Sequence, residues 1–136
     1  MFRSTGILRY SPKRLGEQVS DNWWLVLDCD TEIGRYYRRL YFKAKFTKIQ
    51  RAGWKEHITV IRNEEPIDNK KYLWQKYDGQ EVEFLYSDRI RYDNAFIWLD
   101  IECDSLLDIR EELGLKREPK IPFHLTIGNF KCLQNK

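Results

Sequence analysis

The sequence contains few of the residues that build metal centres and disulfide scaffolds. Its 136 residues include only two histidines, one methionine and three cysteines. The cysteines, Cys29, Cys103 and Cys132, are widely spaced and form no C-x-x-C pair, which argues against both a zinc site and a disulfide framework. We therefore expect no metal, no cofactor and a reduced, cytoplasmic setting.

The chain also lacks long apolar runs. No stretch approaches the roughly 20 consecutive apolar residues of a membrane-spanning helix, and the first residues contain no apolar segment typical of a signal peptide. Hydrophobic residues make up 42% of the chain and charged residues 33%, which is typical of a globular protein rather than a disordered one. With no linker or low-complexity stretch, residues 1–136 are expected to form a single domain without membrane contact.

The net charge of +3 is small, but the charge is unevenly distributed. Residues 35–55 include eight Lys or Arg and no acidic residue. This segment is either a solvated basic face or a surface near a phosphate-bearing ligand.

The pattern of apolar residues and turn signals predicts strands alternating with a few helices. Strands are expected at 6–10, 23–27, 56–61, 80–86, 89–92, 95–101 and 123–127, and helices at 32–43, 70–77 and 104–113. In the helix over 32–43 we expect Tyr36 and Leu40 to face the core, with Tyr37 and Tyr41 as further candidates. The order indicates an α+β fold with a hint of internal duplication, because each main helix precedes a strand that carries a histidine.

The two histidines occur in matching local sequences, HITV at 57–60 and HLTI at 124–127. In a strand, residues i and i+2 point to the same face. His57 and Thr59 are therefore expected to emerge together, as are His124 and Thr126. The intervening aliphatic residues are expected to face the core.

This pair of motifs is suited to chemistry at a phosphate. An imidazole titrates near neutral pH, so two of them can serve as general base and general acid in one turnover. Threonine hydroxyls can donate hydrogen bonds to the non-bridging phosphoryl oxygens. A single His-x-Thr on a strand is more often structural; the pairing of the only two histidines is what favours catalysis.

The two motifs resemble those of the 2H phosphoesterase superfamily, which is defined by two His-x-Thr/Ser motifs on strands. The resemblance implies an α+β, bilobal fold in which two antiparallel-sheet lobes, with helices on the outside, are related by a pseudo-twofold axis around a central cleft. It also implies that His57, Thr59, His124 and Thr126 are catalytic. Which histidine is the base and which the acid stays open.

Within the superfamily the chain is most similar to the phage anti-CBASS phosphodiesterases. The phrases that carry this likeness are GILRY at 6–10, HITVIRNEE at 57–65 and PFHLTIG at 122–128. The resemblance implies metal-independent cleavage of the 3′,5′ bonds of cyclic di- and trinucleotide messengers in the host cytoplasm, by which a phage evades immunity. The cyclic nucleotide would be the partner, and no obligatory protein partner is evident.

Three further residues follow from the resemblance and from strand alternation. Family members are expected to clamp a nucleobase with aromatic residues, for which Tyr10 and then Trp74 are the candidates; ordinary packing is the alternative for both. Arg62 should lie on the face opposite His57, and so away from the phosphate, unless the strand bulges.

Other functions remain open at this point. A 2H enzyme can act instead on RNA ends that carry 2′,3′-cyclic phosphates. A non-catalytic module that binds nucleotide or RNA through the basic segment and the aromatic residues is a second alternative, and a structural protein is a third.

Overall fold

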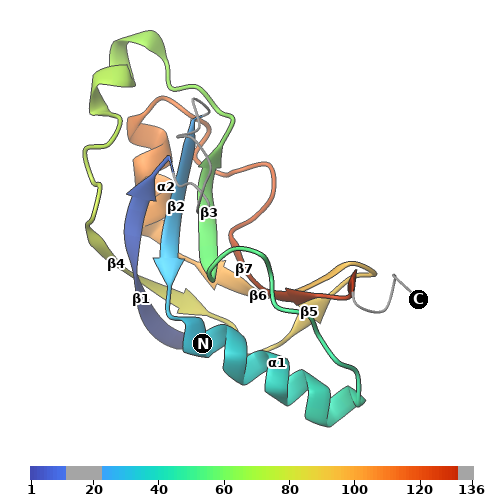
Figure 1. Cartoon of the computed structure of the whole chain (residues 1–136). Coiled ribbons are helices and arrows are strands. Elements are labelled where there is room, and N and C mark those ends of the chain that lie inside the picture. Colours follow the sequence, from blue (N-terminus) through green and yellow to red (C-terminus); the bar gives the residue numbers. More distant parts are fainter. Residues whose placement is uncertain (12–22, 132–136) are drawn as a thin grey trace.

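The computed structural model of the chain describes residues 1–11 and 23–131. Strands and helices follow one another in the order expected from the sequence, beginning with two strands and ending with a strand (Figure 1). The elements are β1 (Phe2–Tyr10), β2 (Trp24–Cys29), α1 (Thr31–Lys45), β3 (His57–Arg62), the 3-10 helix η1 (Asp68–Leu73), β4 (Glu81–Tyr86), β5 (Arg91–Tyr92), β6 (Phe96–Glu102), α2 (Asp104–Glu112) and β7 (His124–Asn129).

All strands belong to one antiparallel sheet in the order β4-β1-β2-β3-β7-β6-β5. A further pairing joins β4 to β6, with Leu85 opposite Glu102 and Tyr86 opposite Ile101. Six strands therefore close into a ring, and β5 extends it beyond β6. The predicted bilobal α+β fold with two separate sheets is wrong: the described residues form a closed six-stranded antiparallel barrel with one additional strand.

The closure has two causes. β3 and β7, which would end separate lobes, pair directly through Ile58 and Leu125. The chain contains two β-β-α-β segments, β1-β2-α1-β3 and β5-β6-α2-β7, with β4 between them. β4 pairs with β1 along six positions and also with β6, so it joins the two segments. The edges that would have separated the lobes are thus used in pairing, which removes unpaired backbone groups.

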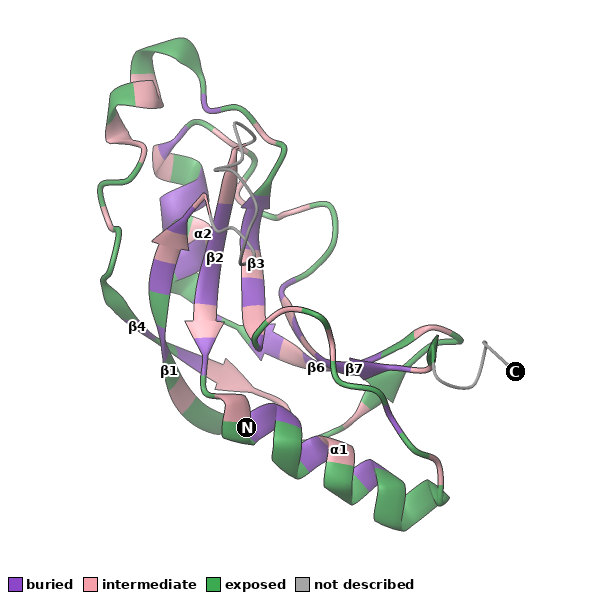
Figure 2. Cartoon of the chain, viewed as in Figure 1, coloured by how far each residue is buried: buried purple, intermediate pink, exposed green. Residues whose placement is uncertain are grey.

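Both α-helices pack on the core-facing side of this sheet rather than on the outside of separate lobes. α1 contacts β7, and α2 contacts β3. One hydrophobic core cluster contains apolar residues of both helices together with the inward aliphatic residues of the strands. Figure 2 shows three consecutive buried residues in β2, buried positions that alternate along the first part of β3, and buried positions that follow one side of α1. The other face of β3 and β7 is thereby left to polar side chains.

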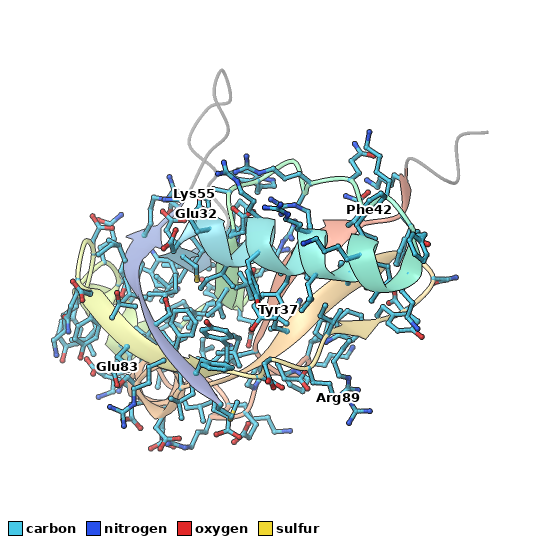
Figure 3. All side chains as sticks on the ribbon, turned by 90° about the horizontal axis from the view of Figure 1, so that it is seen from below. Glu32, Tyr37, Phe42, Lys55, Glu83 and Arg89 are labelled. Atoms are coloured by element: carbon cyan, nitrogen blue, oxygen red, sulfur yellow. The ribbon has the colours of Figure 1, made fainter. Side chains whose placement is uncertain are left out.

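The inward face of α1 differs by one position from the prediction. Ile33, Tyr37 and Tyr41 are buried, whereas Tyr36 and Leu40 are 60% and 41% exposed. The spacing of four residues aligns the buried three on one stripe of the helix. Asp30 begins the helix by accepting a hydrogen bond from the backbone N–H of Glu32. Figure 3 views the molecule along this side, with Glu32, Tyr37 and Phe42 labelled on α1.

Within the described part of the chain, no helix combines the length and the apolar composition needed to cross a membrane.

Candidate active site

The two His-x-Thr motifs lie on strands β3 and β7, as the sequence predicts. His57, Thr59, His124 and Thr126 are partly exposed, while the aliphatic residues between and after them are almost completely buried. The alternation of a strand therefore presents each imidazole and its hydroxyl on one face and anchors the strand through the other. The buried aliphatic residues are Ile58, Val60, Leu125 and Ile127.

The pairing of β3 with β7 brings the two motifs together. Because Ile58 lies opposite Leu125 in an antiparallel pair, the same register places His57 across from Thr126 and Thr59 across from His124. Residues opposite each other in a sheet share a face, so all four side chains form one group. The two histidines are diagonal neighbours, a relation in which Cα atoms lie about 7–8 Å apart. That spacing leaves room for a phosphate between the rings.

Both imidazoles are held in the same way. The Nδ1 atom of His57 lies 2.7 Å from the carbonyl oxygen of Lys55, and that of His124 lies 2.9 Å from the carbonyl oxygen of Pro122. A carbonyl oxygen only accepts, so Nδ1 carries the proton in each ring. In the neutral imidazole Nε2 is then unprotonated and can take a proton; in the charged form it can give one. This equivalence allows either histidine to be the base.

An acidic residue lies opposite each histidine, on the strand that flanks the β3–β7 pair on that side. Asp28 of β2 is opposite His57, and Asp100 of β6 is opposite His124. Each carboxylate accepts a hydrogen bond from an arginine on the next strand. The two arginines are Arg9 of β1, at 2.9 Å, and Arg91 of β5, at 3.0 Å. The two motifs therefore have matching charged surroundings, in which each aspartate is neutralised by its arginine.

An arginine of a helix supports each motif strand from the core side; Arg110 is buried and Arg38 is partly buried. Arg38 of α1 donates to the carbonyl oxygen of Ile127 at 2.7 Å, and Arg110 of α2 donates to that of Val60 at 3.0 Å. Both acceptors lie three residues after a histidine. Each helix thus holds the motif strand that belongs to the other β-β-α-β segment.

A cavity of about 530 Å³ opens beside the second motif. His124 and Thr126 line it, together with Trp98, which stands opposite Thr126 in the register of β6 and β7. Phe96 and Arg91 contribute further walls. His57 and Thr59 do not line this cavity. Of the two motifs, only the second therefore borders it.

The structure places Tyr10 and Trp74 away from this face. Tyr10 is only 7% exposed and is paired with Leu25, a core residue, so its ring points inward. Burial raises the pKa of Tyr10 to about 12. Trp74 packs edge-on against it, with 4.9 Å between ring centroids. These two rings form a packing contact on the core side, whereas Trp98 and Phe96 line the cavity beside the second motif.

Arg62 shares the face of His57 because β3 bulges. The register with β2 shifts between Leu25 and Val26, so Ile61 is buried and Arg62 is exposed. The Arg62 guanidinium lies over the Trp24 ring, 5.1 Å from its centroid. Strict alternation from His57 predicts the opposite face for Arg62, because it does not allow for the extra residue that the bulge inserts into β3.

The residues that the motif analysis did not find are Arg9, Asp28, Arg91, Trp98 and Asp100. A second repeated phrase accompanies three of them: WLVLDCDT at 24–31 and WLDIECDS at 98–105. Each copy runs through an outer strand into the start of the following helix. The repeat indicates two related strand–helix units, but it aligns Asp28 with Glu102 rather than with Asp100, so it does not identify the two acids that lie opposite the histidines.

Within residues 1–11 and 23–131, no group of three or more His, Cys, Asp or Glu side chains is arranged to hold a metal ion. Cys132 lies outside the described residues. Comparison with known proteins found no matching family model, no matching curated protein and no matching solved structure.

Proposed function

We propose that the protein is a phosphodiesterase of the 2H type that cleaves 3′,5′ bonds of cyclic di- or trinucleotide messengers. The observation that carries the proposal is the shared face of His57, Thr59, His124 and Thr126, on two directly paired strands. The closed sheet differs from the bilobal arrangement of the family that the motifs resemble. The proposal therefore rests on the geometry of the site and on the motifs, not on the fold.

The matching Nδ1 bonds give both histidines the protonation pattern that acid–base catalysis needs. One neutral imidazole takes the proton of a ribose 2′-hydroxyl through Nε2, and the 2′-oxygen attacks the adjacent phosphorus. The bond from phosphorus to the 5′-oxygen breaks, and the other histidine, charged, gives its Nε2 proton to that oxygen. A 2′,3′-cyclic phosphate and a free 5′-hydroxyl result.

The threonines complete the arrangement. Each hydroxyl lies across the β3–β7 pair from the histidine of the other motif, so it flanks the space between the rings. There it can donate to the non-bridging oxygens, where charge develops during attack. Cyclic nucleotide messengers act inside bacteria, so the proposal places the reaction in the host cytoplasm.

The test is incubation with cyclic dinucleotides and trinucleotides in the presence of EDTA, followed by chromatography of the products. We expect the wild-type chain to cleave at least one of them. His57→Ala and His124→Ala should each lower kcat by about 10²–10⁴-fold, and Thr59→Val and Thr126→Val by at least about tenfold. Thr5→Val, an exposed threonine on β1, is the matched control and should keep full activity.

Full activity in either histidine variant, with circular dichroism showing an intact fold, would contradict the two-histidine mechanism. RNA ends carrying 2′,3′-cyclic phosphates are assayed in parallel. Turnover of these ends alone would replace the cyclic messenger as the substrate. Salt-sensitive binding of nucleotide without any product in either assay would instead support a binding module.

A further inference from the structure

The cavity beside His124 has an aromatic wall at the reaction centre. Trp98 stands directly opposite Thr126, so its ring adjoins one of the four motif side chains. Phe96, two residues earlier on the same strand and 44% exposed, lines the same space. Planar bases stack on such rings, and each stacked base contributes roughly 1–3 kcal/mol to binding.

The rim of the cavity carries groups that can read the edge of a base. Asp93 accepts hydrogen bonds at Oδ1 from the backbone N–H groups of Ala95 at 2.8 Å and Phe96 at 2.7 Å. These bonds orient the carboxylate and lower its pKa. An ionised carboxylate has about four lone-pair sites, more than two bonds use. Arg91, at the same cavity, uses one N–H bond on Asp100 and has further N–H groups to donate.

This combination matches guanine. Its Watson–Crick edge presents two adjacent donors, N1–H and the N2 amino group, which a single carboxylate can accept together. Its O6 accepts from a guanidinium. Uracil presents only one donor between two carbonyl oxygens, which would face the carboxylate unpaired.

We propose that the cavity is a nucleobase subsite in which Trp98 stacks a guanine and Asp93 binds its Watson–Crick edge. The inference rests on the proposed function, since it assigns one base of that substrate to the side of His124. Only the second motif adjoins this cavity, so base selection belongs to the nucleotide held on that side.

The test is calorimetric titration of the full chain with 3′-GMP and 3′-UMP, neither of which is a diester. We expect 3′-GMP to bind at least tenfold more tightly than 3′-UMP. Trp98→Ala should weaken 3′-GMP binding about tenfold or more, and Trp98→Phe should keep most of the affinity. Asp93→Asn, which retains an oxygen for the two backbone bonds, should remove the preference for 3′-GMP.

Tyr72→Ala removes a ring that is 78% exposed on η1 and serves as the control with unchanged binding. Unchanged affinity in Trp98→Ala, equal affinity for the two nucleotides, or no binding of 3′-GMP would each overturn the inference. His57→Ala separates it from the proposed function, because His57 does not line the cavity. If 3′-GMP binding depends on Trp98 but no diester is cleaved, the phosphodiesterase proposal is contradicted and the nucleobase subsite is supported.

Discussion

Each imidazole of the candidate site uses Nδ1 in a bond to the backbone and leaves Nε2 for the proposed proton transfer. The Nδ1 bonds to the carbonyl oxygens of Lys55 and Pro122 fix the ring orientation and the tautomer. Each acceptor lies two residues before its histidine, just ahead of the motif strand, so the ring is held against the backbone that leads into the strand. These bonds therefore fix the direction of Nε2 relative to the start of each motif strand.

The two described cysteine thiols are expected to be unreactive in the folded protein. Cys29 and Cys103 are 2% and 8% exposed, and burial raises the pKa of both thiols. The thiolate is the nucleophile, so a raised pKa and lack of access both slow alkylation. Iodoacetamide at mildly alkaline pH should leave both unmodified, as peptide mass spectrometry can measure. Both should react once guanidinium chloride unfolds the chain. Rapid labelling of either in the native state would contradict the packing described here.

The helices contact the strands that carry the motifs through two arginines, of which Arg110 is buried and Arg38 is partly buried. Arg110 is 1% exposed and bonds Glu64 twice at 2.8 Å, besides the carbonyl oxygens of Val60 and Lys116. Arg38 forms the corresponding contact with Ile127 and pairs with Glu56, which is 3% exposed. Since a backbone carbonyl cannot move without its strand, these bonds transmit the position of the helix to the site.

Arg110→Met tests this support. The substitution keeps an apolar stem but removes the bonds to two carbonyl oxygens and to Glu64, so we expect a loss of about 3 kcal/mol in the free energy of unfolding. Urea denaturation measures it. Arg117→Met is the matched control, because the ion pairs of Arg117 with Asp108 and Glu111 are solvent-exposed. It should cost less than about 1 kcal/mol. Equal losses in the two variants would show that the buried contacts add nothing.

We expect the closed ring of strands to unfold as one cooperative unit. Pairing of β3 with β7 and of β4 with both β1 and β6 leaves the two β-β-α-β segments sharing one core cluster. Separate lobes would each have a core and could unfold separately, whereas one shared core is expected to unfold in a single transition. Urea curves followed by far-ultraviolet circular dichroism and by tryptophan fluorescence should therefore coincide. Two resolved transitions would argue for independently stable halves.

Local patterns were sufficient for the order of the strands and for the faces of the motif residues, but not for all strand bounds, since β1 begins at Phe2 and β5 is only Arg91–Tyr92. Period-two alternation is a property of neighbouring residues, so His57 and Thr59 could be placed on the same side of their strand, and His124 and Thr126 on the same side of theirs, before any pairing was known. The same rule could have placed Tyr10 correctly: Arg9 precedes it on the outward face, which leaves Tyr10 facing inward beside Leu8. It failed for Arg62, because the bulge in β3 arises from pairing with β2.

By itself, the sequence determined the order of elements, the two matching motifs and the aliphatic residues that anchor them. Only the tertiary structure decided that the motif strands pair with each other, that Asp28 and Asp100 stand beside the histidines, and that the sheet closes through β4 and β6. The physical reason is distance along the chain. Alternation and capping act over a few residues, whereas the register between β3 and β7 depends on how distant segments pack around one core.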